Sequence, residues 1–394
     1  MTNPRILHIL TRLISGGADE NTLLSIRGLQ DSEYDIELLV GGESDEHFVR
    51  GQTDIRIIVL DELRRNILPL KDLIAFYKIY TYIKKNQFHI VHTHTAKAGF
   101  LGRLAARCAG TPIIIHTIHG ITFHDFLNPL VRWIYIVLEK VAGKFTNKLI
   151  MVGEDVKQKY VARNIAKPDS YVTIRSGFHL REFIQSGSLS TSELLDIRKE
   201  LDLKYTDLVI GTVSRLEPRK GHIYLFEAAI ELIRAFPQIQ ILIAGEGSHR
   251  EFLESEARRL HLAENIRFLG YRNDIAELMA LFDIFVLTSL WEGLPRVLVQ
   301  AAALGKPIVT FDVEGANEIV VQGVNGFVVP PKNVALLKER IAWFIQHQDQ
   351  ARQMGLAGKA LVTDAWEAET MVRQIKELYD EMITISTSQF RGKN

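Results

Sequence analysis

Basic side chains and a glycine stand together where the sequence predicts that a strand ends and a helix begins. Arg215 and Lys220 belong to the stretch SRLEPRKG, which follows an apolar run at 208–213 and ends in Gly221. The first N–H groups of a helix lack internal partners and lie at the positive end of its dipole, so they attract phosphate. A guanidinium adds a forked donor and an ammonium adds a point charge. We therefore predict a diphosphate site, with a solvated basic turn as the alternative.

A carboxylate and an amide follow another apolar run in the same half of the chain. Glu292 lies in the turn of the stretch TSLWEGLPRVLVQAAALG at 288–305, and Gln300 lies on the helix expected to hold Pro295 in its first turn. Carboxylate and amide oxygens accept hydrogen bonds from sugar hydroxyls. The stretch predicts a sugar-binding position, although by itself it also fits a glycine–proline turn with a solvated glutamate.

Histidines follow two apolar runs in the first half of the chain. His92 and His94 lie at the end of one run, and His116 and His119 follow the next, with Gly120 directly after them. No carboxylate or cysteine stands at ligand spacing beside these pairs, so we expect no metal site. His119, at a strand end, is the candidate for direct contact with a substrate.

Two series of short apolar runs, separated by amphipathic helical stretches, must position these residues. The expected strands are 6–10, 36–40, 55–60, 89–93, 113–117, 149–152 and 171–174, followed by 208–213, 239–244, 266–269, 284–287 and 307–310. Such runs predict parallel sheets covered on both faces, whose ligands collect at the carboxyl ends of the strands. The Ser- and Gly-rich segment 177–189 separates the two series and is the predicted linker.

Length and composition limit the classes of function. A chain of 394 residues predicts two domains, and its formal net charge of zero gives no reason to expect a nucleic-acid partner. The single cysteine, Cys108, excludes an internal disulfide framework and fits the cytoplasm. We find no signal-like region at the start and no apolar run of bilayer-spanning length. A soluble or peripheral cytoplasmic protein is expected.

The order of motifs along the chain resembles family 4 of the retaining glycosyltransferases. The motifs are GGA at 16–18, HTHTAKAGFLGRLAA, HTIHG, SGFHLREF, SRLEPRKG, GEGSHREFL, FLGYRNDI, EGLPRVLVQAAALGKPIV and GVNGFVVPP. This resemblance covers nearly the whole chain. It implies an α/β protein of the GT-B fold, in which two Rossmann-like, doubly wound domains face each other across a cleft.

The resemblance also implies how the domains divide the chain. Residues 1–183 would form an acceptor-binding domain, and residues 184–364 would form the nucleotide-sugar-binding domain. Residues 365–385 would form a helix that crosses back to pack on the N-terminal domain, and residues 386–394 would form a tail. The apolar face expected on this helix contains Met371, Ile375, Leu378 and Met382.

Four residues have catalytic roles by this resemblance. Arg215 and Lys220 would bind the donor diphosphate, Glu292 would contact the donor sugar, and His119 would reach the transferred sugar. Fixed cations stabilise the charge that develops on a departing phosphate, so we expect a metal-independent reaction with no cofactor besides the donor. A double displacement would need a carboxylate beside the anomeric carbon, and none is evident. Since the resemblance implies retention, we expect front-side attack.

Glycine-containing loops would supply further donor contacts. By the resemblance, the loop with Gly16 and Gly17 would lie next to the phosphate. The backbone of Gly270, Tyr271 and Arg272 would bind the base.

One donor-binding position departs from the family pattern. The amides of Gly293, Leu294 and Arg296 would lie near the donor sugar, as in the family. The second signature glutamate, which usually binds the ribose hydroxyls, is Gln300 here. An amide lacks the charge-assisted hydrogen bond, which is roughly twice as strong as a neutral one. We expect weaker nucleotide binding with activity retained.

The expected acceptor is a glycan. The subgroup resembles enzymes that extend polyprenyl-diphosphate-linked glycans for bacterial surface polysaccharide, and Arg65 and Lys97 are candidates for a clamp on the acceptor phosphate. Two other functions compete: a GT-B nucleotide-sugar epimerase or hydrolase, and a non-catalytic sugar-nucleotide-binding protein. The first would need acid and base carboxylates that the motifs do not show, and the second has only Gln300 in its favour.

A helix predicted at 127–145 suggests contact with the inner face of the plasma membrane. Its core face is expected to contain Leu127, Leu130, Val131, Ile134, Leu138, Val141 and Phe145. The opposite face holds Trp133 and Ile136 among the basic residues Arg132, Lys140 and Lys144. Apolar side chains ringed by basic ones suit an anionic bilayer surface. A contact with another domain or subunit is the alternative.

Overall fold

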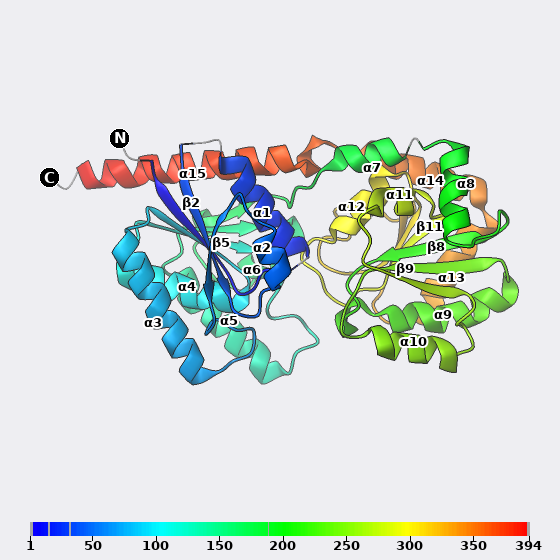
Figure 1. The fold of residues 1–394 in the computed structure, drawn as a ribbon, viewed down its shortest axis with the longest axis horizontal. Helices are drawn as coiled ribbons and strands as arrows, with labels where there is room; N and C mark the ends of the chain where they lie inside the picture. Colours follow the sequence, from blue (N-terminus) through cyan, green and yellow to red (C-terminus); the bar gives the residue numbers. More distant parts are fainter. Residues whose placement is uncertain (1–2, 15, 31–32, 188, 392–394) are drawn as a thin grey trace. The chain divides into compact units, whose positions relative to one another are not determined.

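The computed structural model describes residues 3–14, 16–30, 33–187 and 189–391. The chain forms two units, of which one is Met1–Phe178 with Glu367–Asn394 and the other is His179–Trp366 (Figure 1). The sequence placed the domain boundaries after residues 183 and 364. The first boundary between the units, after Phe178, lies within the predicted linker at 177–189. The segment is not an open loop, however, because Leu180 and Phe183 are buried and anchor helix α7 (Leu180–Ser186). This helix packs against two other helices of the second unit.

The first unit contains a seven-stranded parallel sheet in the order β3-β2-β1-β4-β5-β6-β7. Its strands are β1 (Arg5–Leu10), β2 (Asp35–Gly41), β3 (Arg56–Leu60), β4 (Ile90–His94), β5 (Ile113–Ile118), β6 (Lys148–Met151) and β7 (Tyr171–Thr173). The strand order reverses between β1 and β4. Loops that follow these two strands therefore leave the carboxyl edge of the sheet on opposite faces with a crevice between them.

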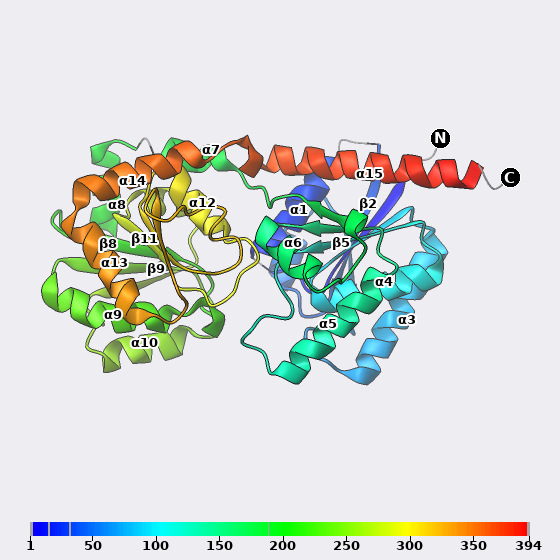
Figure 2. The same ribbon diagram turned by 180° about the vertical axis from the view of Figure 1, so that it is seen from behind.

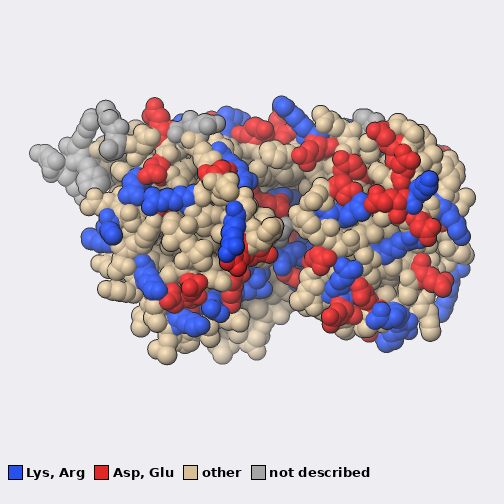
Figure 3. Space-filling view, viewed as in Figure 1, with Lys and Arg blue, Asp and Glu red and all other residues tan. Residues whose placement is uncertain are grey.

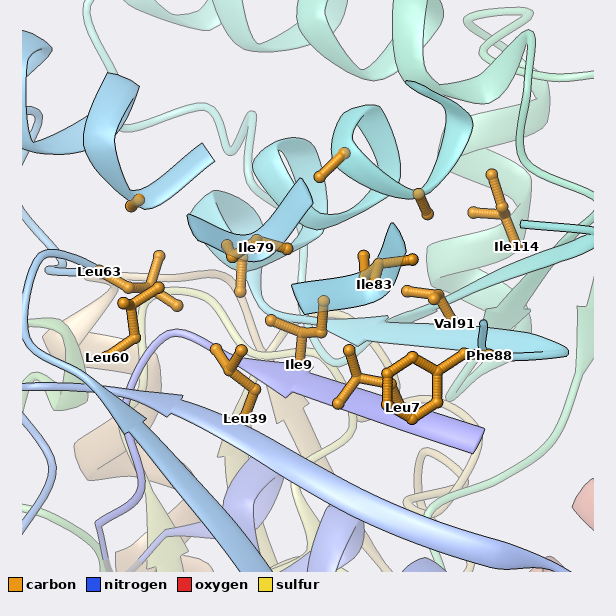
Figure 4. Close-up of a cluster of buried hydrophobic side chains, with 14 residues drawn as sticks. Leu7, Ile9, Leu39, Leu60, Leu63, Ile79, Ile83, Phe88, Val91 and Ile114 are labelled. Carbon is orange, nitrogen blue, oxygen red and sulfur yellow. The ribbon is translucent and has the colours of Figure 1, made fainter. Parts of the chain in front are cut away.

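Helices cover both faces of this sheet. On one face, Leu7 and Ile9 pack with Ile79 and Ile83 beneath α3 (Pro69–Asn86) and α4 (Ala96–Ala109), as Figure 4 shows. The other face is covered by α1 (Gly17–Gln30) and α15 (Ala368–Arg391), which contact each other. The apolar face predicted for α15 is confirmed, since its buried side chains include Met371, Ile375, Leu378 and Met382. The unit also contains α2 (Glu46–Arg50), α5 (Pro129–Gly143), α6 (Glu154–Val161) and the short 3₁₀ helix η1 (Pro168–Ser170).

The second unit contains a six-stranded parallel sheet in the order β10-β9-β8-β11-β12-β13. Its strands are β8 (Leu208–Val213), β9 (Ile239–Ala244), β10 (Ile266–Gly270), β11 (Ile284–Leu287), β12 (Ile308–Phe311) and β13 (Gly326–Val329), of which β13 was not predicted. Besides α7, its helices are α8 (Thr191–Glu200), α9 (His222–Ala235), α10 (Arg250–Arg259), α11 (Ile275–Ala280), α12 (Arg296–Ala303), α13 (Val334–Gln346) and α14 (Gln348–Leu361), with 3₁₀ helices η2 (Pro218–Lys220) and η3 (Asp364–Trp366). The strand order reverses between β8 and β11.

The surface charge is mixed. Basic and acidic side chains are interspersed on the face drawn in Figure 3, in keeping with a formal net charge of zero. Among the described helices, none combines the length and the apolar character needed to cross a bilayer.

Candidate active site

Two loops meet at the carboxyl edge of the second unit's sheet, where the strand order reverses. The loop after β8 contains Arg219 and Lys220, and the loop after the neighbouring β11 contains Glu292. The N–H of Leu290 donates to the carbonyl of Arg219 at 2.8 Å, and the hydroxyl of Thr288 donates to the carbonyl of Lys220 at 3.1 Å. These hydrogen bonds fix the two loops against each other. Such reversals in strand order are where open α/β sheets bind ligands.

Glu292 is the centre of an ion-pair cluster at this edge. Lys220 donates to one of its carboxylate oxygens, and Nη1 of Arg219 donates to the other at 3.2 Å. Arg219 also pairs with Glu217 at 3.0 Å, and the second oxygen of Glu217 pairs with Nε of Arg215 at 3.1 Å. We call these five residues the Glu292 cluster. Its three cations exceed its two carboxylates by one charge.

Burial makes the electrostatics of the cluster strong, since the side chains of Lys220 and Glu292 are only 12% and 10% exposed. Burial alone would raise the pKa of the Glu292 carboxyl, but the charges of Lys220 and Arg219 outweigh it and hold that pKa at about 2. Burial also lowers the pKa of the Lys220 ammonium, and it outweighs the opposing attraction of Glu292. The carboxylate is therefore firmly ionised at neutral pH.

The backbone at Gly221 explains why a glycine ends the basic stretch. Gly221 has a φ of +63°, and a Cβ there would lie 2.2 Å from the carbonyl oxygen of Thr288. It is also the N-cap of α9, so the helix begins where the sequence predicted. The structure thus brings Arg215, Lys220 and Glu292 into one cluster. Sequence analysis missed Arg219, which η2 turns toward Glu292; the signal available was its position beside Lys220 after a proline.

The other residues that the sequence predicts to contact the donor lie in the loop after β11 beside Glu292 and on the helix that follows it. Gly293 and Leu294 are buried, and Pro295 is the N-cap of α12 rather than a residue of its first turn. The N–H of Arg296 donates to the carbonyl of Leu294 at 2.9 Å, so this amide is already engaged within the turn. Gln300 is half-buried and lies one turn further along α12 than Arg296.

The loop after β10 lies two strands away from β8 in the sheet order. The carbonyl of Gly270 accepts a hydrogen bond from the N–H of Gly245 at 2.8 Å. Tyr271 is exposed, and Arg272 forms ion pairs with Asp274 and Glu200. The Arg272 side chain therefore fixes the loop. Binding of the base by the backbone of this loop stays a prediction.

In the first unit, the predicted residues follow β1 and β5. Gly16 accepts a hydrogen bond from the N–H of Glu20 at 2.9 Å, and Gly17 begins α1. His119 follows β5 and lies beside β4, with its Nε2 at 3.0 Å from Nδ1 of His94. Sequence analysis missed His8 on β1, whose Nδ1 lies 3.0 Å from Nε2 of His94.

In the described part of the chain, three histidines form a group that could hold a metal ion. His8, His92 and His94 are buried and offer ligand nitrogens within 4.8 Å of one another. Each of their ring nitrogens also lies within hydrogen-bond distance of a protein atom. Binding an ion here would break hydrogen bonds in a buried site, at a substantial cost.

Comparison with known proteins gives this geometry a family. Residues 195–361 match the family model described as "Glycosyl transferases group 1", and residues 16–152 match the one described as "Glycosyl transferase 4-like". The two matches together cover most of both sheets. The chain belongs to these glycosyltransferases.

Relatives that match this glycosyltransferase over nearly its whole length agree with the assignment. It is 28% identical to the Escherichia coli UDP-Gal:alpha-D-GlcNAc-diphosphoundecaprenol alpha-1,3-galactosyltransferase, over 96% of this chain and 97% of that protein. It is 27% identical to the Campylobacter jejuni N,N'-diacetylbacillosaminyl-diphospho-undecaprenol alpha-1,3-N-acetylgalactosaminyltransferase, over 91% and 94%. Its fold is similar to that of Anabaena Alr3699/HepE crystallised with UDP-glucose, with a TM-score of 0.79, 24% identity and coverage of 96% and 99%. The expected GT-B fold is thereby confirmed.

The residues expected to bind the acceptor in this glycosyltransferase lie at one loop of the first unit. Arg65 is exposed in the loop between β3 and α3, and its N–H donates to Glu43 at 2.8 Å. Lys97 is mostly buried; it pairs with Asp72 at 2.6 Å and donates to the carbonyl of Asn66. Lys97 thus holds the loop that contains Arg65, and the role of both in acceptor binding stays a prediction.

The faces predicted for the helix at 127–145 were wrong. In α5 the buried positions are Glu139, Ala142 and Gly143, because Glu139 forms a buried ion pair at 2.9 Å with Arg103 of α4. The apolar residues expected in the core are instead exposed at Leu130, Val131, Ile134 and Val141.

Only some of the residues predicted to face the membrane are exposed in the structure. Ile136 is partly buried beside the core that contains Phe123 and Tyr160, so it is no lipid contact. Arg132 pairs with Asp125 at 2.7 Å. Trp133 is exposed, as are Lys140 and Lys144.

Proposed function

We propose that the protein transfers a sugar from a nucleoside-diphosphate sugar to a polyprenyl-diphosphate-linked glycan in the synthesis of bacterial surface polysaccharide. The Glu292 cluster is the observation that supports this most directly. Its cations, of which Lys220 is mostly buried and Arg215 and Arg219 are partly exposed, lie at the reversal of strand order, where a diphosphate would be bound. The two relatives named above have diphosphoundecaprenol-linked acceptors in their names. The UDP-glucose complex of the similar HepE structure supports a nucleotide-sugar donor.

We further propose that the reaction retains the anomeric configuration and needs no metal ion. The acceptor hydroxyl oxygen bonds to the anomeric carbon from the face of the leaving group while the bond from that carbon to the phosphate oxygen breaks. The bonding electron pair stays on the diphosphate, which also takes the hydroxyl proton. Lys220, Arg219 and Arg215 stabilise the charge that grows on the phosphate. Glu292 contacts the donor sugar, and His119 contacts the transferred sugar.

Nucleotide release from a panel of UDP-, GDP- and ADP-sugars, with and without extracted polyprenyl-diphosphate glycans, tests this proposal. We expect one donor class to release nucleotide only when the lipid-linked glycan is present. The anomeric coupling constant of the product should match that of the donor, and a chelator should leave the rate unchanged. Inversion, or inactivation reversed only by a divalent ion, would contradict the mechanism. Equal release without acceptor would indicate a hydrolase.

We also propose that the first unit contacts an anionic membrane through exposed apolar side chains around the amino ends of α3 and α5. These ends lie on the same side of the unit in both views (Figures 1 and 2). The exposed residues are Ile67, Leu68, Leu70, Leu73, Ile74 and Tyr77 near α3, and Phe126, Leu130, Val131, Trp133 and Ile134 near α5. Exposed lysines, including Lys71, lie among them. A polyprenyl-linked acceptor is itself a membrane component, so the two proposals agree.

Sedimentation with phosphatidylglycerol vesicles tests the membrane contact. Leu70 is 80% exposed and Trp133 is 60% exposed, so Leu70→Ser with Trp133→Ala should release the protein without unfolding it. Raised salt should also weaken binding, since each basic residue near an anionic surface contributes about 1 kcal/mol. Tyr205→Ala with Leu356→Ser removes exposed apolar groups from the second unit and serves as the control. Equal binding of the two double variants would refute this surface.

A further inference from the structure

A chain of hydrogen-bonded side chains crosses the buried interior of the first unit and ends at His119. The hydroxyl of Tyr379 lies 3.3 Å from Nε2 of His8. Nδ1 of His8 lies 3.0 Å from Nε2 of His94, and Nδ1 of His94 lies 3.0 Å from Nε2 of His119. A branch runs the other way, since Tyr379 also lies 2.6 Å from Nδ1 of His92.

The sheet register explains why these side chains meet. His8 of β1 is paired directly with His92 of β4, and His94 of β4 is paired with Thr117 of β5. Alternate residues of a strand face the same side, so His8, His92 and His94 all point to the face that α15 covers. Tyr379 of α15 is fully buried there, and Nε2 of His92 lies 2.7 Å from the hydroxyl of Thr117.

Four members of this histidine chain, Tyr379, His8, His92 and His94, are uncharged inside the protein. Burial lowers the pKa of His8 to about 3 and holds the pKa values of His92 and His94 well below their usual range. Burial raises the pKa of Tyr379, so its hydroxyl keeps its proton. A neutral imidazole has one donor nitrogen and one acceptor nitrogen. A ring that accepts a hydrogen bond at one nitrogen must therefore donate through the other, so all hydrogen bonds between the histidines run in the same direction.

The histidines can point in either of two directions, depending on whether Tyr379 accepts a hydrogen bond from His8 or donates one to it. In one, Tyr379 donates to His92 and accepts from His8, which makes each following histidine a donor through Nε2. In the other, every bond is reversed. The distances favour the first, because 2.6 Å fits an O–H donor whereas 3.3 Å is too long for one and nearer the range of N–H donors.

We propose that Tyr379, His8 and His94 are positioning residues that hold His119 as its Nε2–H tautomer, so that Nδ1 is the acceptor nitrogen for a substrate hydroxyl. The tautomer follows from the geometry of the first unit alone, while the hydroxyl contact rests on the proposed function. A donor at Nδ1 would instead recognise a carbonyl or an ether oxygen. The chain thereby selects a hydroxyl-bearing sugar position as the partner of His119.

Nitrogen-15 NMR of protein labelled in its histidine rings tests the tautomer directly, because bare and protonated ring nitrogens have distinct shifts. The His119 signals are identified by their loss in His119→Gln. We expect His119 of the wild type to show a protonated Nε2 and a bare Nδ1. Tyr379→Phe keeps the buried ring but removes the hydroxyl that sets the direction, so the His119 signals should shift toward a mixture of tautomers. His94→Gln should have the same effect.

Tyr34→Phe is the matched control, because Tyr34 packs edge-on against Tyr379 but its hydroxyl donates a hydrogen bond to Asp380, which is not part of the histidine chain. Its His119 signals should stay as in the wild type. Turnover should fall about 2- to 12-fold in Tyr379→Phe, the range for one neutral hydrogen bond, and should not fall in Tyr34→Phe.

Three results would overturn the inference. They are a protonated Nδ1 on His119 in the wild type, an unchanged tautomer in folded Tyr379→Phe and His94→Gln, and a stoichiometric metal in the purified protein that His8→Ala releases. Full activity in His119→Ala would instead refute the sugar contact of the proposed function and leave the tautomer result standing.

Discussion

Replacing Glu292 by glutamine removes the charge at the centre of the Glu292 cluster while keeping the shape of the side chain. A carboxyl whose pKa moves from 4.5 to about 2 gains about 3 kcal/mol of interaction in its charged form. The charged form of Lys220 has no such net gain, because burial lowers the pKa of its ammonium despite the pairing with Glu292. The substituted amide would still accept one hydrogen bond through its carbonyl oxygen. We therefore expect Glu292→Gln to lower the free energy of unfolding by about 2–3 kcal/mol at pH 7.

The pH dependence of this loss follows from the direction of the shift. Between pH 4.5 and pH 2 the unfolded state binds a proton at Glu292 that the folded state does not. The advantage of the wild type over the variant should thus be constant above pH 4.5 and should shrink as the pH falls below it.

Denaturant unfolding followed by tryptophan fluorescence measures this difference, since Trp291, Trp343 and Trp366 all lie in the second unit. Glu231→Gln is the control, because Glu231 pairs with Lys338 on the surface and should contribute little. Equal stability of wild type and Glu292→Gln at pH 7, or a difference that grows below pH 4.5, would refute the electrostatic account of the cluster.

Four further substitutions have expected outcomes. Lys220→Ala and Arg215→Ala should each reduce turnover about a hundred- to a thousandfold, as loss of one donor to a developing oxyanion does; near-normal kcat in both would remove the diphosphate assignment. Gln300→Glu should tighten binding of the free nucleoside diphosphate by about 1 kcal/mol in isothermal titration, and weaker binding would mean that the amide faces elsewhere. Gly221→Ala should destabilise the second unit by at least about 1–2 kcal/mol in the same unfolding assay, because its backbone is left-handed and its new Cβ would meet Thr288; unchanged stability would contradict that backbone.

Strand-end chemistry was the part of the site that the sequence could predict. Parallel strands joined by helices bring their carboxyl ends to one edge, so Lys220 and Glu292 were expected together although 72 positions separate them. The pairing of Arg219 with Glu292 was not predictable, because it depends on how η2 turns one basic residue relative to the next.

Registers and helix rotation were not predictable in the first unit. Periodicity counts apolar residues, so it assigned Leu130 and Ile134 to the core of α5. In the structure, the opposite side of α5 faces the protein, where Glu139 forms a buried ion pair with Arg103 and the small residues Ala142 and Gly143 allow close packing. His8 was missed for a similar reason, since its proximity to His94 requires β1 and β4 to be neighbours. β13 escaped notice because it has only four residues and begins with a glycine.

The discontinuity of the first unit has a consequence for how the protein is made on the ribosome. Its core is completed by Met371, Ile375 and Tyr379, which are translated after the whole second unit. The contiguous second unit can fold as soon as Trp366 emerges, whereas the first must wait with Ile6, Ile90 and Ile113 uncovered. A nascent chain stalled before α15 would therefore leave this apolar face exposed, and we expect chaperones to bind it until that helix has been made.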